Sequence, residues 1–505
     1  MSSRSKNLKL NMVTGLFQEL VAVICGLILP RVVLSYFGSK YNGIVNSITN
    51  IMAFSVVFRS GLGAVTNAAL FKPLAEKNVA AISGIMVATK DFMNKVGWLL
   101  AVCIVGFAAA YPLIVADEFN YWFSFSLVLI IGASSFVENM FSIKYKILLQ
   151  ADQKYYVQTI FAVIAQVLST VFSILLIVSG AGIHLVKLGA VVGMMTTPFM
   201  LKIYVDRHYT IDWKAQADTV AIKSRWDAFA QQLANIMNNN VATIVMTFFV
   251  SLSEISVYSV YYMVAHNITK LFVSMLNGVK ATFGNMIAKG ETESLRKRFE
   301  NVEFLTYTCS TIIFVTTAIL ITPFVLLYTK NITDVNYDQY WLGIFISLVS
   351  MMTVVRVPYQ MLVEAAGIFK QTRNGAFLEI ILNVAFSVAF VKLFGVVGIV
   401  VGGFAAAIVR TTQFAWVSQK TVLKRSILGV IKNYLLYFAM SVGLVALSYV
   451  LDCFRCNSFG EWILFAVAVF AAVTVAVMGL NLIFQFKQCK SVAAYLLKRG
   501  KKRVK

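Results

Sequence analysis

The chain has 505 residues, of which 59% are hydrophobic and 13% are charged, whereas soluble domains carry about 25% charged residues. This composition excludes an ordinary soluble protein and predicts an integral membrane protein. The net charge of +22 does not indicate a nucleic-acid-binding protein, because the basic residues are spread along short connections between apolar runs, as in the cytoplasmic loops of membrane proteins.

Apolar runs long enough to cross a bilayer, at about 20 residues each, recur along the whole chain. The first run is too long for the apolar region of a signal peptide and lacks a small-residue cleavage site, so we expect it to stay as the first helix. We predict an all-α polytopic membrane protein with fourteen transmembrane helices, at residues 10–36, 42–70, 84–112, 120–147, 155–180, 184–205, 226–251, 254–282, 299–328, 338–365, 375–394, 397–419, 431–452 and 459–485.

The connections between these spans alternate in their content of lysine and arginine. In membrane proteins the basic connections are the cytoplasmic ones, so the alternation predicts which ends of the spans face the cytoplasm. By this rule both termini are cytoplasmic, together with the basic connections 1–9, 72–83, 148–154, 206–225, 286–298, 366–374, 420–430 and 486–505. The even number of spans agrees with this orientation.

The first twelve spans form two sets of six with matching spacing. A shift that moves Gly63 onto Gly278 places span 1 on span 7, and so on to span 6 on span 12, and it also moves Gly180 onto Gly395. Two halves with an even number of spans insert the same way up and are related by an axis along the membrane normal. We predict two six-helix lobes plus two C-terminal helices, with an N-lobe at 1–205, a cytoplasmic interfacial linker at 206–225, a C-lobe at 226–420, spans 13 and 14 within 421–485, and a basic cytoplasmic tail at 486–505.

Two pairs of glycines predict where helices approach each other closely. Gly189 and Gly193 lie four residues apart in the sixth span, and Gly398 and Gly402 have the same spacing in the twelfth. Small residues at this spacing allow two membrane helices to pack backbone against backbone.

The cations deep in the predicted spans are Arg59, Lys270, Arg356 and Arg410, and Arg31 lies nearer a span end. A charged residue within a bilayer is costly, so by default it faces a bundle interior or a water-filled cavity. Arg59 and Lys270 lie near mid-span, where snorkelling is difficult, whereas Arg31 lies about one turn from a helix end and could snorkel to the interface. Clustered cations suit a phosphate-bearing ligand, because guanidinium groups bind phosphate oxygens with paired hydrogen bonds and lysine adds a compact charge.

Four acids are candidates for intramembrane carboxylates: Glu19, Glu138, Glu364 and Glu379. Each could take part in ion coupling, or it could balance the charge of a nearby cation. In particular, Arg356 and Arg410 could form structural ion pairs with Glu364 or Glu379 instead of binding a ligand. Both interpretations remain open from the sequence.

Polar residues in the eighth span recur at steps of three and four, which places them on one face of a helix: Ser256, Ser259, His266, Asn267, Lys270, Ser274 and Asn277. Such a stripe either joins helices through hydrogen bonds or lines a hydrated cavity. Hydrogen bonds between membrane helices usually need only one or two polar residues, so we favour a cavity. We predict that its polar lining comes from Asn46, Asn235, Asn238, His266, Asn267, Ser274 and Asn277.

Short motifs in the first two spans and the turn between them resemble a known family. They are Arg4-Ser5-Lys6-Asn7 before the first span, Pro30-Arg31 near its end, Phe37-Gly38-Ser39-Lys40-Tyr41-Asn42-Gly43 at the turn, Arg59-Ser60-Gly61-Leu62-Gly63 in the second span and Phe71-Lys72-Pro73-Leu74-Ala75 after it. These motifs resemble the polysaccharide transporters, which are flippases of lipid-linked oligosaccharides in the multidrug/oligosaccharidyl-lipid/polysaccharide (MOP) exporter superfamily. The length and the number of spans extend this resemblance over the whole chain.

The resemblance implies a MOP-exporter-like fold and a flippase in the bacterial cytoplasmic (inner) membrane. Its substrate would be an undecaprenyl-diphosphate-linked oligosaccharide repeat unit for O-antigen or capsule, moved from the cytoplasmic to the outer leaflet by alternating access. Basic residues of the first, second and eighth helices would hold the diphosphate, which implies Arg31, Arg59 and Lys270, the last matched by its span and not by a motif. Arg356 and Arg410 are further candidates, and spans 13 and 14 would hold the polyprenyl tail.

The partners that we expect are the polyprenyl-diphosphate-linked oligosaccharide, anionic membrane lipid and a polysaccharide polymerase of the same pathway, without nucleic acid. Two alternatives remain. A cation-coupled multidrug exporter of the same superfamily would typically have twelve spans and an acidic cavity, and a membrane-embedded glycan polymerase would need a sizeable outside domain. The sequence has no glycine-rich phosphate loop followed by Lys-Ser/Thr, and Cys453 and Cys456 lack the two further ligands of a zinc site. We therefore expect no enzymatic activity, no cofactor and no metal.

Overall fold

The structure is a computed structural model that describes residues 2–218, 240–450 and 456–492, and all regular secondary structure in these ranges is helical. The chain divides into two compact units, Met1–Ser256 (unit 1) and Val257–Lys505 (unit 2). The division falls later in the chain than the predicted linker at 206–225. Each unit is described below by itself.

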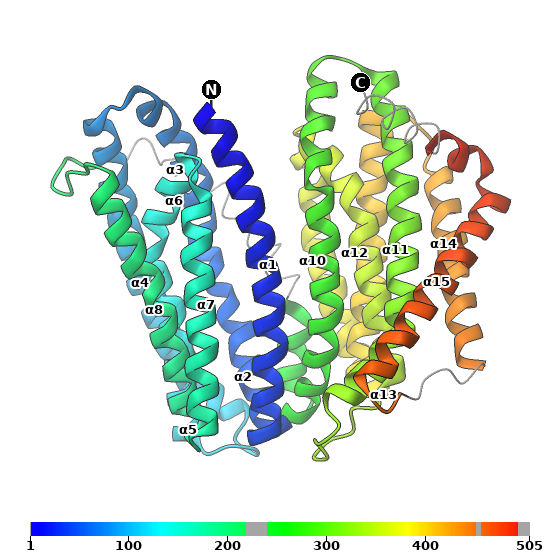
Figure 1. Ribbon diagram of the computed structural model, residues 1–505, viewed down its shortest axis with the longest axis horizontal. Coiled ribbons are helices and arrows are strands. Elements are labelled where there is room, and N and C mark those ends of the chain that lie inside the picture. The colour runs from blue at the N-terminus through cyan, green and yellow to red at the C-terminus, as the bar shows by residue number, and fades with distance from the viewer. Residues whose placement is uncertain (1, 219–239, 451–455, 493–505) are drawn as a thin grey trace. The chain divides into compact units, whose positions relative to one another are not determined.

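Unit 1 contains the helices that correspond to the first six predicted spans (Figure 1). Four of these spans form continuous helices, whereas the second is broken by a 3₁₀ turn at Ala53–Val56 and the fourth by a π-helical turn at Glu138–Ser142. The helices are α1 (Ser2–Phe37), α2 (Ser39–Met52), α3 (Val57–Glu76), α4 (Val79–Ile114), α5 (Tyr121–Val137), α6 (Ile143–Ala151), α7 (Tyr155–Val178) and α8 (Ile183–His208). The main packing pairs are α7 with α8, α1 with α7, and α4 with α5.

The first of the two predicted glycine pairs lies at the contact between α7 and α8. A Cβ atom added to Gly189 would lie 2.5 Å from the Leu176 side chain, and one added to Gly193 would lie 2.5 Å from the backbone of Ser169. No real Cβ atom tolerates such distances, so the two glycines set how closely these helices approach. This confirms the prediction of close packing.

The first part of the predicted linker, residues 209–218, packs against unit 1. The Asp212 amide donates to the Ser83 hydroxyl at 2.9 Å, and the Asp218 amide donates to the Gly84 carbonyl at 3.0 Å. The Trp213 ring lies edge-on to Tyr145, with centroids 6.2 Å apart. These contacts attach the segment to α4 and α6, while its placement on a membrane surface stays a prediction.

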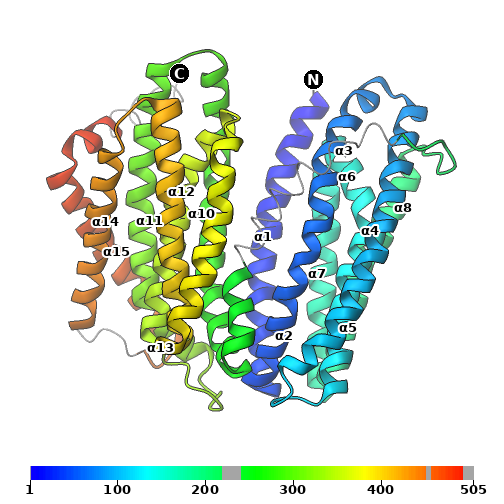
Figure 2. The same ribbon diagram turned by 180° about the vertical axis from the view of Figure 1, so that it is seen from behind.

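Unit 2 is built around α11, the most deeply buried of the long apolar helices among the described residues. The helices are α10 (Leu252–Ala288), whose first turn belongs to unit 1, α11 (Thr292–Tyr328), α12 (Tyr340–Ala365), α13 (Phe369–Val417), α14 (Leu428–Val450) and α15 (Phe459–Phe484). Helices α12, α14 and α15 pack on α11, and α13 packs on α12 (Figure 1 and Figure 2).

Helix α13 holds the eleventh and twelfth predicted spans, which reverse direction at Gly395. This residue has φ 57° and ψ −138°, a conformation that a residue with a side chain rarely adopts. After the reversal, Cβ atoms added to Gly398 and Gly402 would lie 2.2 Å from the Phe390 carbonyl oxygen and 2.5 Å from the Ser387 amide nitrogen. The second glycine pair therefore also marks a close helix contact, between the two halves of α13.

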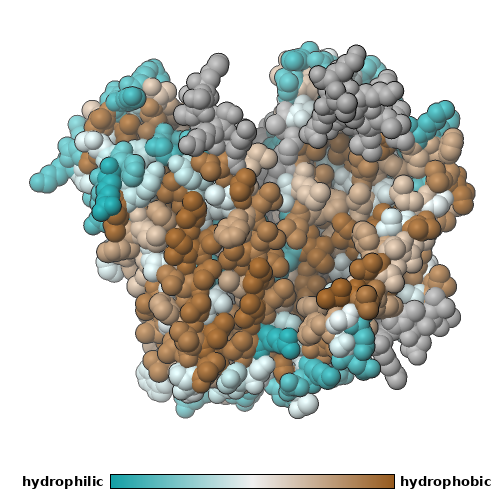
Figure 3. All heavy atoms as spheres, viewed as in Figure 1, coloured by the Kyte–Doolittle hydropathy of each residue, from teal (hydrophilic) through white to brown (hydrophobic). Residues whose placement is uncertain are grey.

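Ten helices in the described ranges are long and apolar enough to cross a membrane, and exposed side chains along the middle of these helices are mainly hydrophobic, with hydrophilic ones towards the ends (Figure 3). The number of such helices is lower than the fourteen predicted spans for four reasons. The second span is broken, the seventh lies largely outside the described residues, the eighth is the polar α10, and the eleventh and twelfth are joined in α13. The protein is a multi-pass membrane protein, and the total of fourteen spans stays a prediction.

Candidate functional site

A ladder of aromatic and polar side chains lies along α10 in unit 2. Tyr258, Tyr262, His266 and Lys270 are four residues apart, so they follow one line along the helix. The rings of Tyr258 and Tyr262 are stacked with centroids 5.5 Å apart, and those of Tyr262 and His266 with centroids 4.8 Å apart. Lys270, at the end of the ladder, is exposed. The α10 ladder thus combines ring surfaces, hydrogen-bonding groups and one cation.

The sequence analysis included His266 and Lys270 but missed the two tyrosines, because it did not count tyrosine among the polar residues. The two tyrosines precede His266 by four and eight residues, and this spacing could have placed them on the same line of the helix. Of the other predicted residues on this helix, Asn267 is half-buried, and the Ser274 hydroxyl donates within the helix to the Leu271 carbonyl at 2.7 Å. The side chain of Asn277 lies outside the described residues.

Polar residues of α2 join helices within unit 1. The Asn42 amide group donates to the Ser256 hydroxyl at 2.7 Å, and the hydroxyls of Ser47 and Thr247 lie 2.8 Å apart. The Asn46 amide group donates to the Asn42 carbonyl at 2.8 Å. Ser256, expected on the polar face of α10, therefore contacts α2, while a cavity-lining role for Asn46 stays a prediction.

The described residues place only part of the predicted diphosphate site. Arg31 is exposed on α1, with Pro30 before it inside the same helix. Arg59 belongs to α3 by its backbone, but its side chain lies outside the described residues, as do Asn235 and Asn238 altogether. The joint role of Arg31, Arg59 and Lys270 in binding a diphosphate therefore stays a prediction.

Arg356, Glu379 and Arg410 form a buried ion-pair cluster in unit 2. The Glu379 carboxylate accepts from Arg356 Nη1 at 2.8 Å and lies 3.4 Å from Arg410 Nε. Arg410 also donates from Nη1 to the Thr372 carbonyl at 2.7 Å. The side chains of the three charged residues are only 15%, 8% and 8% exposed, in the order named. This is the ion-pair alternative that the sequence left open, with Glu379 as the shared acid.

Glu364, near the end of α12, also forms an ion pair, with Lys280 of α10. Its carboxylate accepts from Lys280 Nζ at 2.6 Å and from the Gln360 amide at 2.9 Å. Lys280 did not enter the sequence reasoning, although it lies ten residues after Lys270 on α10. Its side chain is 49% exposed, so water screens this pair more than the Arg356 cluster.

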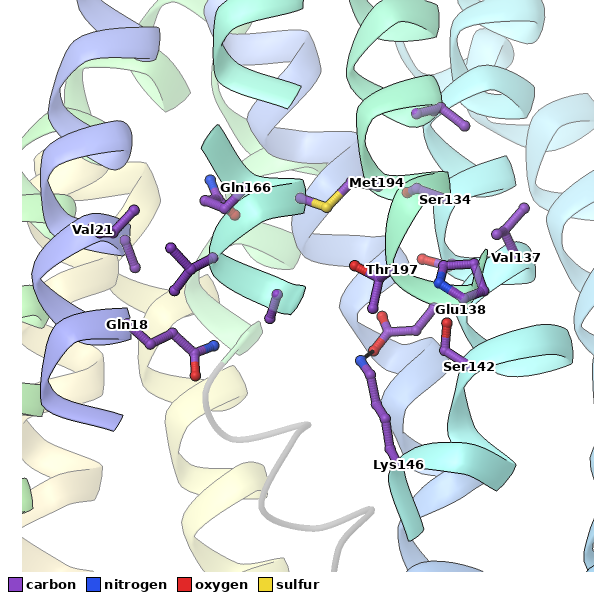
Figure 4. A pocket seen from close by; sticks show the side chains of 16 residues that line it. Gln18, Val21, Ser134, Val137, Glu138, Ser142, Lys146, Gln166, Met194 and Thr197 are labelled. Atoms are coloured by element: carbon purple, nitrogen blue, oxygen red, sulfur yellow. Dashed lines mark hydrogen bonds and ion pairs between the residues drawn. The ribbon is translucent and has the colours of Figure 1, made fainter. Parts of the chain in front are cut away.

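A pocket of about 240 Å³ with a mixed polar and apolar lining lies in unit 1, between α1, α5, α6, α7 and α8 (Figure 4). On one side the Glu138 carboxylate accepts from Lys146 Nζ at 2.9 Å. Gln18, Gln166 and Thr197 supply further polar groups to the lining. Glu138 belongs to the π-helical turn between α5 and α6, and such turns are frequent at functional sites. The neighbouring Glu19, another ion-coupling candidate, is half-buried on α1 and does not line this pocket.

The acids predicted inside the spans are therefore mostly balanced by cations. Glu138, Glu364 and Glu379 each have a basic partner in their own unit, which agrees with charge balance and leaves ion coupling a prediction. Three or more histidine, cysteine, aspartate or glutamate residues do not gather anywhere in the described part of the chain in a way that could hold a metal ion.

This chain resembles known proteins in its fold, and matches were found among solved structures only. No family model matches the sequence, and no curated protein matches it either. Among solved structures, the lipid II flippase MurJ in an inward closed conformation is similar, with a TM-score of 0.68 and 17% identity over 92% of this chain and 98% of that one.

Multidrug transporters share the same fold. An inward-facing multidrug resistance MATE family transporter of the MOP superfamily has a TM-score of 0.65 and 15% identity, over 81% of this chain and 95% of its own. The Vibrio cholerae MATE transporter VcmN, in its bent form, has a TM-score of 0.55 and 14% identity, over 84% of this chain and 98% of its own. This multi-pass membrane protein therefore has the fold shared by a lipid flippase and the multidrug transporters of the MOP superfamily.

Proposed function

We propose that the protein is a flippase that moves a polyprenyl-diphosphate-linked oligosaccharide from the cytoplasmic to the outer leaflet, for surface polysaccharide biosynthesis in the bacterial inner membrane. Arg31, Arg59 and Lys270 hold the diphosphate. The α10 ladder offers hydrogen-bonding groups to the sugars, and α14 and α15 accompany the prenyl tail. Alternating access of the two units carries the head group across, with both chain termini in the cytoplasm.

The extent of the fold similarity supports a lipid-linked substrate. MurJ is a flippase of lipid II, and its structure matches 92% of this chain, compared with 81% and 84% for the multidrug transporters. Two spans beyond a twelve-span core would account for such a difference. This supports the total of fourteen spans and the appended role of α14 and α15.

The observation that carries the proposal is the difference in ion pairing between Lys270 and the acids of the spans. Lys270 is exposed on α10 and forms no ion pair with any residue that the structure describes. Three of the four candidate intramembrane acids, Glu138, Glu364 and Glu379, are paired with cations, and the fourth, Glu19, is half-buried on α1. An unpaired acid would suit a cationic drug, and an unpaired lysine in a membrane span suits an anion. A diphosphate provides the charge and the acceptor oxygens that an ammonium group binds.

Deletion of the gene, followed by mass analysis of the lipid-linked glycans, tests this function. The expected result is accumulation of a complete oligosaccharide on its polyprenyl diphosphate, together with loss of the surface polysaccharide. Complementation with the wild-type gene should reverse both effects. Unchanged glycans together with increased sensitivity to cationic drugs would contradict the proposal and favour a multidrug exporter.

A further inference from the structure

A second candidate binding site lies in unit 2, where α13 ends and α14 begins. A pocket of about 280 Å³ opens there, lined by Trp416, Gln419, Lys420, Lys424, Arg425 and Ile427. Its lining contains three basic residues and no acid. The sequence predicted only a basic cytoplasmic connection at 420–430. None of the residues that line this pocket belongs to the diphosphate site proposed above.

The backbone of this connection is unusual. The turn Ser418–Leu423, which includes the first residues of the connection, is π-helical, and π-helical turns are frequent at functional sites. Lys424 then adopts the left-handed conformation, with φ 50° and ψ 46°. A left-handed residue commonly ends a helix, and Lys77 ends α3 in the same way. At Lys424 this conformation turns the chain between α13 and α14.

Arg425 is already occupied by acids and forms a fixed wall of the pocket. It donates to Glu300 at 2.9 Å, to Glu303 at 3.1 Å and to the Gln419 carbonyl oxygen Oε1 at 2.8 Å. Burial acts to lower the pKa of Arg425, but Glu303 and Glu300 raise it above its ordinary value. Glu300 also pairs with Arg296, whose Nε lies 3.6 Å from the Glu300 carboxylate, so the two acids that contact Arg425 are balanced by two arginines.

Three groups of the pocket are available to a ligand. Lys420 and Lys424 are exposed, and neither forms an ion pair with an acid within the described ranges. The Lys420 ammonium lies 4.8 Å from the centre of the Trp416 ring. Gln419 is only 1% exposed, and its Nε2 donor has no hydrogen-bond partner among the described residues. Two ammonium groups and one unsatisfied buried donor favour an anion with several acceptor oxygens.

An apolar groove of about 300 Å³ lies next to this pocket, with almost no polar surface in its lining. Residues four apart on a helix share one face. Two pairs of residues with this spacing join the lining of the groove to the lining of the basic pocket. Thr412 of the groove lies four residues before Trp416 on α13. Ile427 of the pocket immediately precedes α14, and its carbonyl accepts from the amide of Ile431 of the groove at 3.1 Å. The groove therefore continues from the basic pocket along the two helices.

The groove opens to the outside of the helices. Its residues Ile408, Ile431, Leu435 and Phe438 are between 38% and 66% exposed, while Met351 and other buried side chains form its floor. Exposed apolar side chains on membrane spans face lipid chains. A basic pocket at the end of a lipid-facing apolar groove has the polarity of a single lipid molecule, with the charge at one end and the chain along the helices.

We propose that the pocket and groove together bind one anionic phospholipid of the surrounding bilayer. Its phosphate interacts with Lys420, Lys424 and Gln419 Nε2, and one acyl chain lies in the groove over Met351, Ile431 and Leu435. The bilayer's own lipid is the occupant because the groove opens on the lipid-facing side of the spans. This binding does not depend on the transport function proposed above.

Native mass spectrometry of the full-length protein in neutral detergent tests the proposal, with phosphatidylglycerol and phosphatidylcholine of identical acyl chains as the titrated lipids. Replacing both Lys420 and Lys424 by glutamine should weaken phosphatidylglycerol binding about 30-fold, from the usual strength of two lysine contacts to an anionic lipid surface. Binding of phosphatidylcholine should change little. Unchanged phosphatidylcholine binding shows that the Lys420→Gln, Lys424→Gln protein folds, and the Lys420→Arg, Lys424→Arg protein should retain phosphatidylglycerol binding.

Lys487 and Lys490 provide the matched control. They are exposed at the same end of unit 2, since Gln485 donates to Asn433 of α14 at 3.3 Å, and they do not line the pocket. Glutamine at both should leave binding unchanged, and an equal loss would overturn the proposal in favour of diffuse attraction. A tryptophan at Thr412, where groove and pocket meet, should weaken binding of both lipids.

Competitors decide between the possible occupants. Inorganic phosphate should compete poorly with the phospholipid because it lacks a chain, and competition at equal concentration would exclude a role for the groove. Wild-type binding by the Lys420→Gln, Lys424→Gln variant would also overturn the proposal. If polyprenyl phosphate occupies the site in preference to phosphatidylglycerol, the assignment to a bilayer phospholipid is wrong.

Discussion

Replacing Glu379 by glutamine tests whether Arg356 and Arg410 are held by this carboxylate or are free to bind a substrate. The change keeps the shape of the side chain and removes the negative charge 2.8 Å from Arg356 Nη1 and 3.4 Å from Arg410 Nε. All three side chains are at most 15% exposed, so water screens the cluster weakly. Breaking a buried pair by removing one partner typically costs about 3–5 kcal/mol, because an uncompensated charge stays buried. We expect Glu379→Gln to destabilise unit 2 by this amount.

Glu364→Gln is the matched control, since it makes the same chemical change in a more exposed pair. Its partner Lys280 is 49% exposed, and exposed pairs contribute about 0–1 kcal/mol. Unfolding by dodecyl sulfate in mixed micelles measures the free energy of unfolding of both variants. Polysaccharide export in cells, normalised to the amount of protein in the membrane, is measured in parallel.

A double variant measures how much of the effect of Glu379→Gln comes from its contact with Arg356. If the Arg356–Glu379 contact is structural, then adding Arg356→Met to Glu379→Gln should cost less than the sum of the single changes, because the second change removes a charge that the first left unpaired. Additive effects would show that the pair contributes nothing. A Glu379→Gln protein with wild-type stability but no export would refute the structural interpretation and assign the arginines to transport.

Three further predictions concern other parts of the chain. Lys270→Ala and Lys270→Gln should abolish export at near-normal protein levels, whereas Lys270→Arg should retain more of it; full export by Lys270→Gln would contradict a role for the charge. Gly43→Ala should lower the melting temperature, since its Cβ would lie 1.7 Å from the Leu252 carbonyl oxygen and overpacking typically costs about 1–3 kcal/mol, while Gly15→Ala, with nothing within 4 Å, should be neutral or stabilising. In intact cells an impermeant maleimide should label Cys456 but not Cys489, and labelling of Cys489 would reverse the predicted orientation. Burial raises the pKa of the Cys456 thiol, so less reactive thiolate is present at neutral pH and labelling should become faster as the pH rises.

The sequence was sufficient for the helices because a membrane span must be long and apolar. The predicted spans 155–180 and 459–485 agree closely with α7 (Tyr155–Val178) and α15 (Phe459–Phe484). Both glycine pairs marked real close contacts, since only a missing side chain allows the distances seen there. These features depend on local composition and spacing, which the sequence displays directly.

Partners in space were harder to predict. The sequence indicated that buried arginines need acids, but it could not choose between Glu364 and Glu379, because the choice depends on how α12 and the two halves of α13 pack. The Lys280 and Lys146 partners were missed for the same reason. The basic pocket at Lys420 and Lys424 was also not foreseen, since it depends on a π-helical turn and on the pairing of two acids of α11 with Arg296 and Arg425.

The reversal of α13 at Gly395 has a consequence for how the protein enters the membrane during synthesis. Two spans joined without a separate loop leave the translocon as one helical hairpin, so their side chains meet before they face lipid. Arginine in the middle of a lone helix opposes insertion by about 2.5–3.5 kcal/mol. Here Arg410 on the second half lies 3.4 Å from Glu379 on the first half. We expect each half to insert poorly when expressed as an isolated segment, and the intact hairpin to insert well, because the bilayer then receives a charge that already has its counterion.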